Sequence, residues 1–165
     1  MSVAWGAEPD RAADMGSVVE VRGAGDGAYL IELVFYQPVS LLPEAAGARY
    51  DAEPDGAGVF CDPMPSAVVL DRLRERAWVR CLEAIDVAAA AAEFRMLLKD
   101  RRIRAAEHPA LEQAVTYAQR RPLAASYGFE RVRVPCDMSP LNAAAFGVWG
   151  LRRHEAASDV SALVM

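Results

Sequence analysis

The sequence predicts an α/β domain in which helices flank a mixed β-sheet. Two runs rich in Val, Ile, Leu and Tyr, at 17–22 and 28–36, are separated by the glycine-rich segment 23–27, a pattern typical of an antiparallel hairpin. Beyond the hairpin, short apolar runs alternate with segments whose apolar residues recur at helical spacing. The length of 165 residues suits a single domain, which we place at 1–157, before a polar tail at 158–165.

Each expected element follows from a local signal. A short strand at 2–5 ends at Gly6, because the polar segment 7–14 contains Pro9 and is typical of a loop. Pro63 and Pro140 mark helix starts. The full expected order is a strand at 2–5, hairpin strands at 17–22 and 28–36, a helix at 41–49, a strand at 59–61, a helix at 67–76, a strand at 78–82, a helix at 87–100, a strand at 103–105, a helix at 109–119, an exposed strand at 129–134 and a helix from 139 to about 154.

Composition excludes several classes of protein. With 53% hydrophobic and 25% charged residues the chain is globular, and its net charge of −5 argues against a domain that grips nucleic acid through a broad basic face. The three cysteines (Cys61, Cys81 and Cys136) are odd in number and lack C-x-x-C spacing, so they predict neither a disulfide framework nor a zinc site. The N-terminus lacks a signal-peptide pattern, and no apolar run would span a membrane, so we expect a cytoplasmic protein.

Asp62 is the acid whose position most resembles a site. It follows the short apolar run 59–61, which predicts a buried strand that delivers Asp62 to one edge of the sheet. An Asp before Pro63 at a helix start is also a common helix cap. Asp62 is therefore a candidate metal ligand, a helix cap, or both.

Several stretches, in this order, resemble the C-terminal nuclease domain of the large terminase subunit of tailed bacteriophages. They are Val3-Ala4-Trp5-Gly6, Phe60-Cys61-Asp62-Pro63, EFRMLLKDRRI at 93–103, His108-Pro109-Ala110-Leu111 and SPLNAAAFGVWGL at 139–151. The resemblance runs from about residue 3 to 154 and does not include the family's ATPase motor domain. It implies an RNase H-like fold.

The resemblance also implies a two-metal DNA endonuclease site, in which carboxylates hold Mg²⁺ or Mn²⁺. Of the three acids expected in that family, Asp62 matches the one in the "DP" turn. The acid of the first strand falls on Ala4, and that of the last helix falls on Asn142. One carboxylate and one amide would neutralise two divalent ions poorly, so we expect little metal binding and leave open whether the chain is an enzyme.

Other side chains could complete or extend the site. Asp10, Asp14, Glu20 and Asp137 are candidate replacements for the missing acids, although charged residues are mostly solvated. Four arginines, together with Lys99 and Arg104, either contact phosphates or form a solvated face; they are Arg101, Arg102, Arg120 and Arg121. Any contact of this domain alone with double-stranded DNA would be weak.

Two functions remain open from the sequence. The first is a catalytically impaired, structural or interaction module in phage or prophage DNA packaging, with a packaging motor, the portal or DNA as partner. The second is an active Mg²⁺- or Mn²⁺-dependent endonuclease that cuts packaged viral DNA with displaced acids. A trimmed or altered version of an active protein is a third explanation of Ala4 and Asn142.

Overall fold

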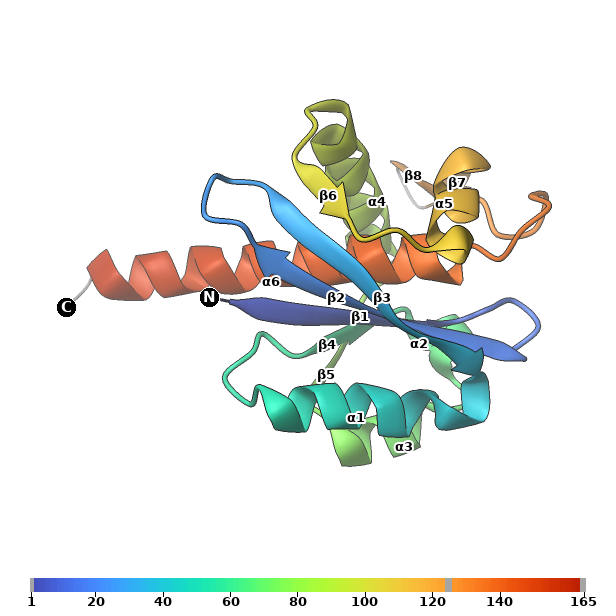
Figure 1. Ribbon diagram of the computed structural model, residues 1–165, viewed down its shortest axis with the longest axis horizontal. Helices are drawn as coiled ribbons and strands as arrows, with labels where there is room; N and C mark the ends of the chain where they lie inside the picture. The colour runs from blue at the N-terminus through green and yellow to red at the C-terminus, as the bar shows by residue number, and fades with distance from the viewer. Residues whose placement is uncertain (1, 124–125, 164–165) are drawn as a thin grey trace.

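The computed structural model describes residues 2–123 and 126–163, and within them a six-stranded sheet lies between two layers of helices (Figure 1). The sheet contains β1 (Val3–Pro9), β2 (Met15–Gly23), β3 (Tyr29–Pro38), β4 (Val59–Cys61), β5 (Val79–Cys81) and β6 (Ile103–Ala105). A separate hairpin contains β7 (Arg120–Leu123) and β8 (Ser126–Phe129). The helices are η1 (Val39–Leu41), α1 (Leu42–Ala52), α2 (Pro63–Ser66), α3 (Leu70–Arg76), α4 (Ala84–Lys99), α5 (Pro109–Thr116) and α6 (Ser139–Leu163).

The sheet is mixed, as the sequence predicts, with strand order β5-β4-β1-β2-β3-β6. β1, β2 and β3 form an antiparallel meander, which confirms the predicted hairpin. β4 runs parallel to β1, β5 runs parallel to β4, and β6 runs parallel to β3. The carboxyl ends of β1, β4 and β5 therefore meet at one edge of the sheet.

Each face of the sheet covers its own apolar core because side chains alternate along a strand. Trp5 is fully buried on the face covered by α1 and α3, where it packs with Leu42 and Leu73. Ala4 and Phe146 belong to the other core, under α4 and α6. Glu8 is four residues after Ala4 on the same strand, so its side chain points to the same face, the one that α6 covers.

Small residues let α6 pack directly on the backbone of β1. A Cβ atom added to Gly6 would lie 1.7 Å from the carbonyl oxygen of Ala143, and one added to Gly147 would lie 3.0 Å from the nitrogen of Gly6. The alanine-rich part of the helix is buried throughout 139–151. The central strand and the last helix are thus in backbone contact, which positions the start of α6 near the end of β1.

Three predicted boundaries are wrong. β1 continues through Gly6 to Pro9, so residues 7–9 are strand rather than loop. The expected strand at 129–134 is irregular beyond Phe129, and the hairpin strands β7 and β8 precede it. α6 continues past the expected end at about 154 to Leu163. None of the helices in the described part of the chain is long and apolar enough to cross a membrane.

Candidate functional site

Two acids meet where the parallel strands β1 and β4 end. The register pairs Trp5 with Val59 and Gly6 with Phe60. Two residues further along, the same register places Glu8 beside Asp62, the residue that follows β4. Each acid precedes a proline, Pro9 or Pro63, at the end of its strand. The edge of the sheet therefore carries a pair of carboxylates, of which the sequence analysis identified only Asp62.

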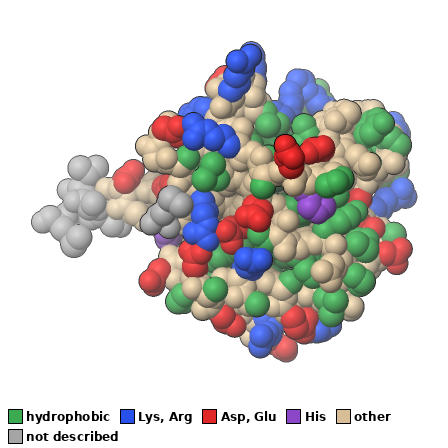
Figure 2. All heavy atoms as spheres, in the orientation of Figure 1, with side chains coloured by type: hydrophobic (Ala, Val, Ile, Leu, Met, Phe, Trp, Pro, Cys, Tyr) green, Lys and Arg blue, Asp and Glu red, His purple; other side chains and the backbone are tan. Residues whose placement is uncertain are grey.

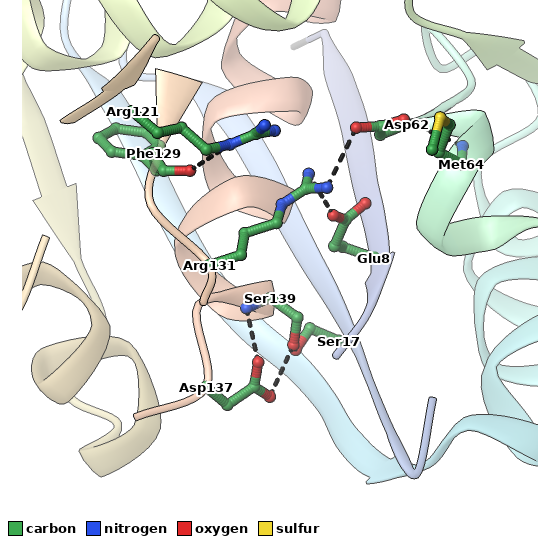
Figure 3. A network of polar contacts seen from close by, with 9 residues as sticks. All are labelled: Glu8, Ser17, Asp62, Met64, Arg121, Phe129, Arg131, Asp137 and Ser139. Carbon is green, nitrogen blue, oxygen red and sulfur yellow. Dashed lines mark hydrogen bonds and ion pairs between the residues drawn. The ribbon is translucent and has the colours of Figure 1, made fainter. Parts of the chain in front are cut away.

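The guanidinium of Arg131 lies between these two carboxylates (Figure 3). Its Nη2 is 2.6 Å from Oε1 of Glu8, and its Nη1 is 3.2 Å from Oδ2 of Asp62. The exposed fractions of the side chains are 1% for Glu8, 12% for Asp62 and 17% for Arg131. A buried acid pair must be neutralised, and here a cation from the chain itself does so.

Local hydrogen bonds fix Asp62 and Arg131 in place. Oδ1 of Asp62 accepts a hydrogen bond of 3.0 Å from the backbone N–H of Met64, so Asp62 caps α2 as one of the two interpretations predicted. Glu130 accepts hydrogen bonds from the backbone N–H groups of Arg131 and Val132 at 2.9 and 2.8 Å. Arg131 is thereby presented from the irregular segment 130–138 rather than from a strand or helix.

Burial changes the protonation of Glu8. Desolvation raises its pKa from 4.5 to about 8. The Arg131 guanidinium opposes this shift, while the negative charges of Asp62 and Asp137 add to it. A protonated Glu8 leaves Asp62 and Arg131 as a balanced ion pair, so the cluster carries little net charge near neutral pH.

A second polar group lies at the start of α6, close to the acid pair. Asp137 accepts hydrogen bonds of 2.8 Å from both the backbone N–H and the Oγ of Ser139. The Ser139 hydroxyl is also 2.7 Å from that of Ser17 on β2 (Figure 3). Asn142 is buried one turn further along the helix, and its Nδ2 has no hydrogen-bond partner within the described chain. Asp137 therefore anchors the helix start, whereas Asn142 keeps an unused donor.

Arg131 separates two hollows in the surface. The first, which we call the Asn142 hollow, has a volume of about 500 Å³. The second, the Asp62 hollow, has a volume of about 450 Å³. Arg11 and Arg131 line both hollows, and Arg121 lines only the second. Arg131 therefore faces both hollows and Asp62 faces one, whereas Glu8 lines neither.

The structure does not bring Ala4, the predicted first-strand position, together with Asp62. Ala4 is fully buried and pairs with Val21 in the middle of the sheet. A strand rises about 3.3 Å per residue, so Ala4 lies about 13 Å before Glu8 and away from the edge that carries Asp62. The acid nearest to the expected role is Glu8, and its signal in the sequence is the second acid–proline pair, Glu8-Pro9, which mirrors Asp62-Pro63. Glycine and proline usually interrupt strands, so Gly6 and Pro9 indicated that the strand ended before Glu8.

The proposed replacement acids are mostly used elsewhere. Asp10 accepts hydrogen bonds from the backbone N–H groups of Asp14 and Met15 and closes the turn between β1 and β2. Glu20 accepts hydrogen bonds from Arg22 and from the indole of the buried Trp5. Asp14 lies in the same turn as Asp10. Of the four candidates, Asp10 and Asp137 line the same hollow as Arg131, and Asp137 also adds to the raised pKa of Glu8.

These residues do not fit the metal centre that the resemblance implies. Among residues 2–123 and 126–163, no group of three or more His, Cys, Asp or Glu side chains is arranged to hold a metal ion. The position between the two carboxylates is taken by the guanidinium. Two divalent ions need several anionic oxygen ligands, which this donor set does not provide.

The four arginines predicted to contact nucleic acid lie in different places. Arg101 and Arg102 follow the C-terminal end of α4, where Arg102 donates a hydrogen bond to the carbonyl of Gly27. Arg121 lines the Asp62 hollow near the first turn of α4, and Arg120 lines a different hollow. The sixteen residues of α4 span about 24 Å, so Arg121 lies far from Arg101 and Arg102, whereas Arg120 shares its hollow with Arg95 and Leu98 near the C-terminal end of α4.

A solved structure has the same architecture. The structure described as the crystal structure of the HK97 bacteriophage large terminase superposes on 90% of this chain with a TM-score of 0.70, at 12% sequence identity. The fold is RNase H-like. This confirms the predicted fold class: a mixed sheet flanked by helices.

The match covers 39% of the terminase chain, so the present chain spans well under half of that protein's length. No protein-family model matches the sequence, and no curated protein matches it either. At 12% identity the likeness establishes the fold and leaves the activity open.

Proposed function

We propose that this chain is a terminase-nuclease-like domain of phage or prophage DNA packaging that serves as a structural or interaction module rather than as a working endonuclease. The observation that carries this proposal is the Arg131 guanidinium on the Glu8–Asp62 pair, within a fold shared with a phage large terminase. The partners it implies are DNA and components of a packaging motor or portal, in the cytoplasm of a bacterial host.

The chemistry of the acid pair supports a non-catalytic role. Hydrolysis of a phosphodiester by two metal ions requires anionic ligands that are free to bind them. Glu8 is buried with a pKa raised to about 8, and Asp62 is already bound to Arg131 and to the backbone of Met64. Neither carboxylate is available for a metal without breaking these contacts.

A cleavage assay tests the proposal directly. Supercoiled plasmid is incubated with the protein in Mg²⁺ and, separately, in Mn²⁺, alongside Asp62→Asn and Glu8→Gln variants. We expect the wild-type protein to nick no more plasmid than either variant does. Nicking by the wild type that disappears in both variants would overturn the non-catalytic role.

The second candidate function is an active endonuclease, and one observation favours it. Glu8 and Asp62 adjoin each other at the carboxyl edge of the sheet, and Asp137 and Asn142 lie nearby. A substrate that displaced Arg131 would leave two carboxylates facing one another. The same plasmid assay separates the two functions, because only this candidate predicts Mn²⁺-dependent products that require both Glu8 and Asp62.

A further inference from the structure

The guanidinium of Arg131 has the contacts that a bound cation would have. Its two terminal nitrogens each bind a different carboxylate, at 2.6 Å to Glu8 and 3.2 Å to Asp62. In the described part of the chain, no other basic side chain forms an ion pair with either acid. The neutralisation of the acid pair thus depends on one removable side chain.

That side chain enters from outside the sheet. Glu8 is on β1 and Asp62 caps α2, so both acids belong to regular elements. Arg131 instead belongs to the irregular segment 130–138, and hollows of about 500 and 450 Å³ flank it. Arg131 belongs to neither of the elements that carry the acids, and its side chain lines both hollows, so solvent ions in the hollows adjoin the position that it occupies.

A third oxygen donor lines the same hollow as Arg131. Asn142 is 3% exposed, lines the same hollow as Arg131, and has an unpartnered side-chain Nδ2. Its amide group can turn to present the carbonyl oxygen, because no hydrogen bond from Nδ2 holds it. Two carboxylates and an amide oxygen are ligands of the kind that a hard divalent cation prefers.

We propose that the Arg131 guanidinium replaces a divalent cation between Glu8 and Asp62, and that removing its charge converts the pair into a site for a single ion such as Mn²⁺. The guanidinium and an incoming Mn²⁺ would repel each other at contact distance in a buried setting, so only one of them occupies the pair. The proposed site takes one ion because its two anionic ligands, Glu8 and Asp62, are too few to neutralise two divalent ions. This inference deepens the proposed function by stating what keeps the acids from a metal.

The test compares Mn²⁺ binding to Arg131→Gln with binding to the wild type by isothermal titration calorimetry. The double variant Arg131→Gln/Glu8→Gln removes a ligand, and Arg131→Lys keeps the positive charge. We expect Arg131→Gln to bind Mn²⁺ at least about tenfold more tightly than the wild type, and both control variants to lose that gain. A folded Arg131→Gln protein without the gain would overturn the proposal, as would a wild type that binds Mn²⁺ equally well.

Thermal unfolding covers the case in which Arg131→Gln folds poorly. A variant in which the buried Glu8–Asp62 pair has lost its counter-charge is destabilised, and a cation that binds only the folded state must restore stability. We expect millimolar Mn²⁺ to raise the unfolding temperature of Arg131→Gln and to leave that of the double variant unchanged. If Arg131→Gln stays unfolded with Mn²⁺, the proposal is wrong.

These readouts do not depend on nuclease activity. Plasmid cleavage by a wild type that also binds Mn²⁺ tightly would contradict both this inference and the proposed function. A wild type that does not cleave, together with an Arg131→Gln variant that gains no Mn²⁺ affinity, would contradict this inference alone.

Discussion

At the scale of single residues, Glu8 combines near-complete burial with a titratable group. Burial raises its pKa to about 8, so the folded protein holds a proton that an unfolded chain releases above about pH 4.5. Between these two values the folded state binds more protons than the unfolded state. The contribution of Glu8 to stability is therefore fully present below about pH 4.5 and is lost as the pH rises through about 8.

We predict that Glu8→Gln removes this pH dependence, because glutamine resembles the protonated acid and cannot ionise. The free energy of unfolding of the wild type should fall relative to that of the variant between about pH 5 and 8, by up to about 1.4 kcal/mol per pH unit. Urea unfolding at a series of pH values measures the difference. Glu32→Gln, at an exposed position on β3, is the matched control. Its free energy of unfolding should change with pH in the same way as that of the wild type.

Arg131 illustrates why part of the site escapes sequence analysis. It belongs to a stretch in which apolar and charged residues alternate, a pattern that predicts an exposed strand and an outward-pointing arginine. The side chain instead turns inward because two buried acids attract it, and those acids come from elements more than 60 residues away along the chain. Such a contact has no local signature.

At the scale of elements, the contact between β1 and α6 determines how far β1 runs. Gly6 suggests the end of a strand, yet it is needed in the middle of one, since any side chain there would collide with Ala143. The hairpin, β4 and β6 follow from local patterns and were predicted within a few residues. The length of β1 depends on a helix that begins at Ser139, so the sequence around Gly6 could not reveal it.

We predict that Gly6→Ala destabilises the protein by about 3 kcal/mol or more, at the upper end of the cost of overpacking. The added Cβ would be 1.7 Å from a backbone oxygen of Ala143, so relief requires α6 to move away from the sheet. Gly25→Ala is the control, because that turn residue has a positive φ of 79° and no heavy atom within 4 Å of an added Cβ. It should cost only about 1 kcal/mol. Equal losses in chemical unfolding would show that helix contact is not the cause.

At the scale of the whole molecule, charge limits how the domain can contact DNA. The net charge is −5, and Figure 2 shows acidic and basic side chains interspersed over the face it displays. A contact must therefore be local. Arg11 and Arg121 line the Asp62 hollow beside the acid pair, whereas Arg101 and Arg102 lie at the far end of α4. Arg121 is held there by a hydrogen bond of 3.0 Å from its Nε to the carbonyl of Phe129.

We predict that DNA binding depends on Arg11 and Arg121 and not on the pair at the end of α4. Arg11→Ala/Arg121→Ala and Arg101→Ala/Arg102→Ala remove the same charge, so a general electrostatic effect would weaken binding equally in both. Loss of two phosphate contacts should reduce the slope of log affinity against log salt by about 1.8 in the first variant only. Fluorescence anisotropy with a labelled duplex over a salt series gives the slopes. Equal slopes in the two variants would mean that no localised DNA contact exists at the Asp62 hollow, and a larger loss in the second variant would move the contact to the hairpin end of the sheet.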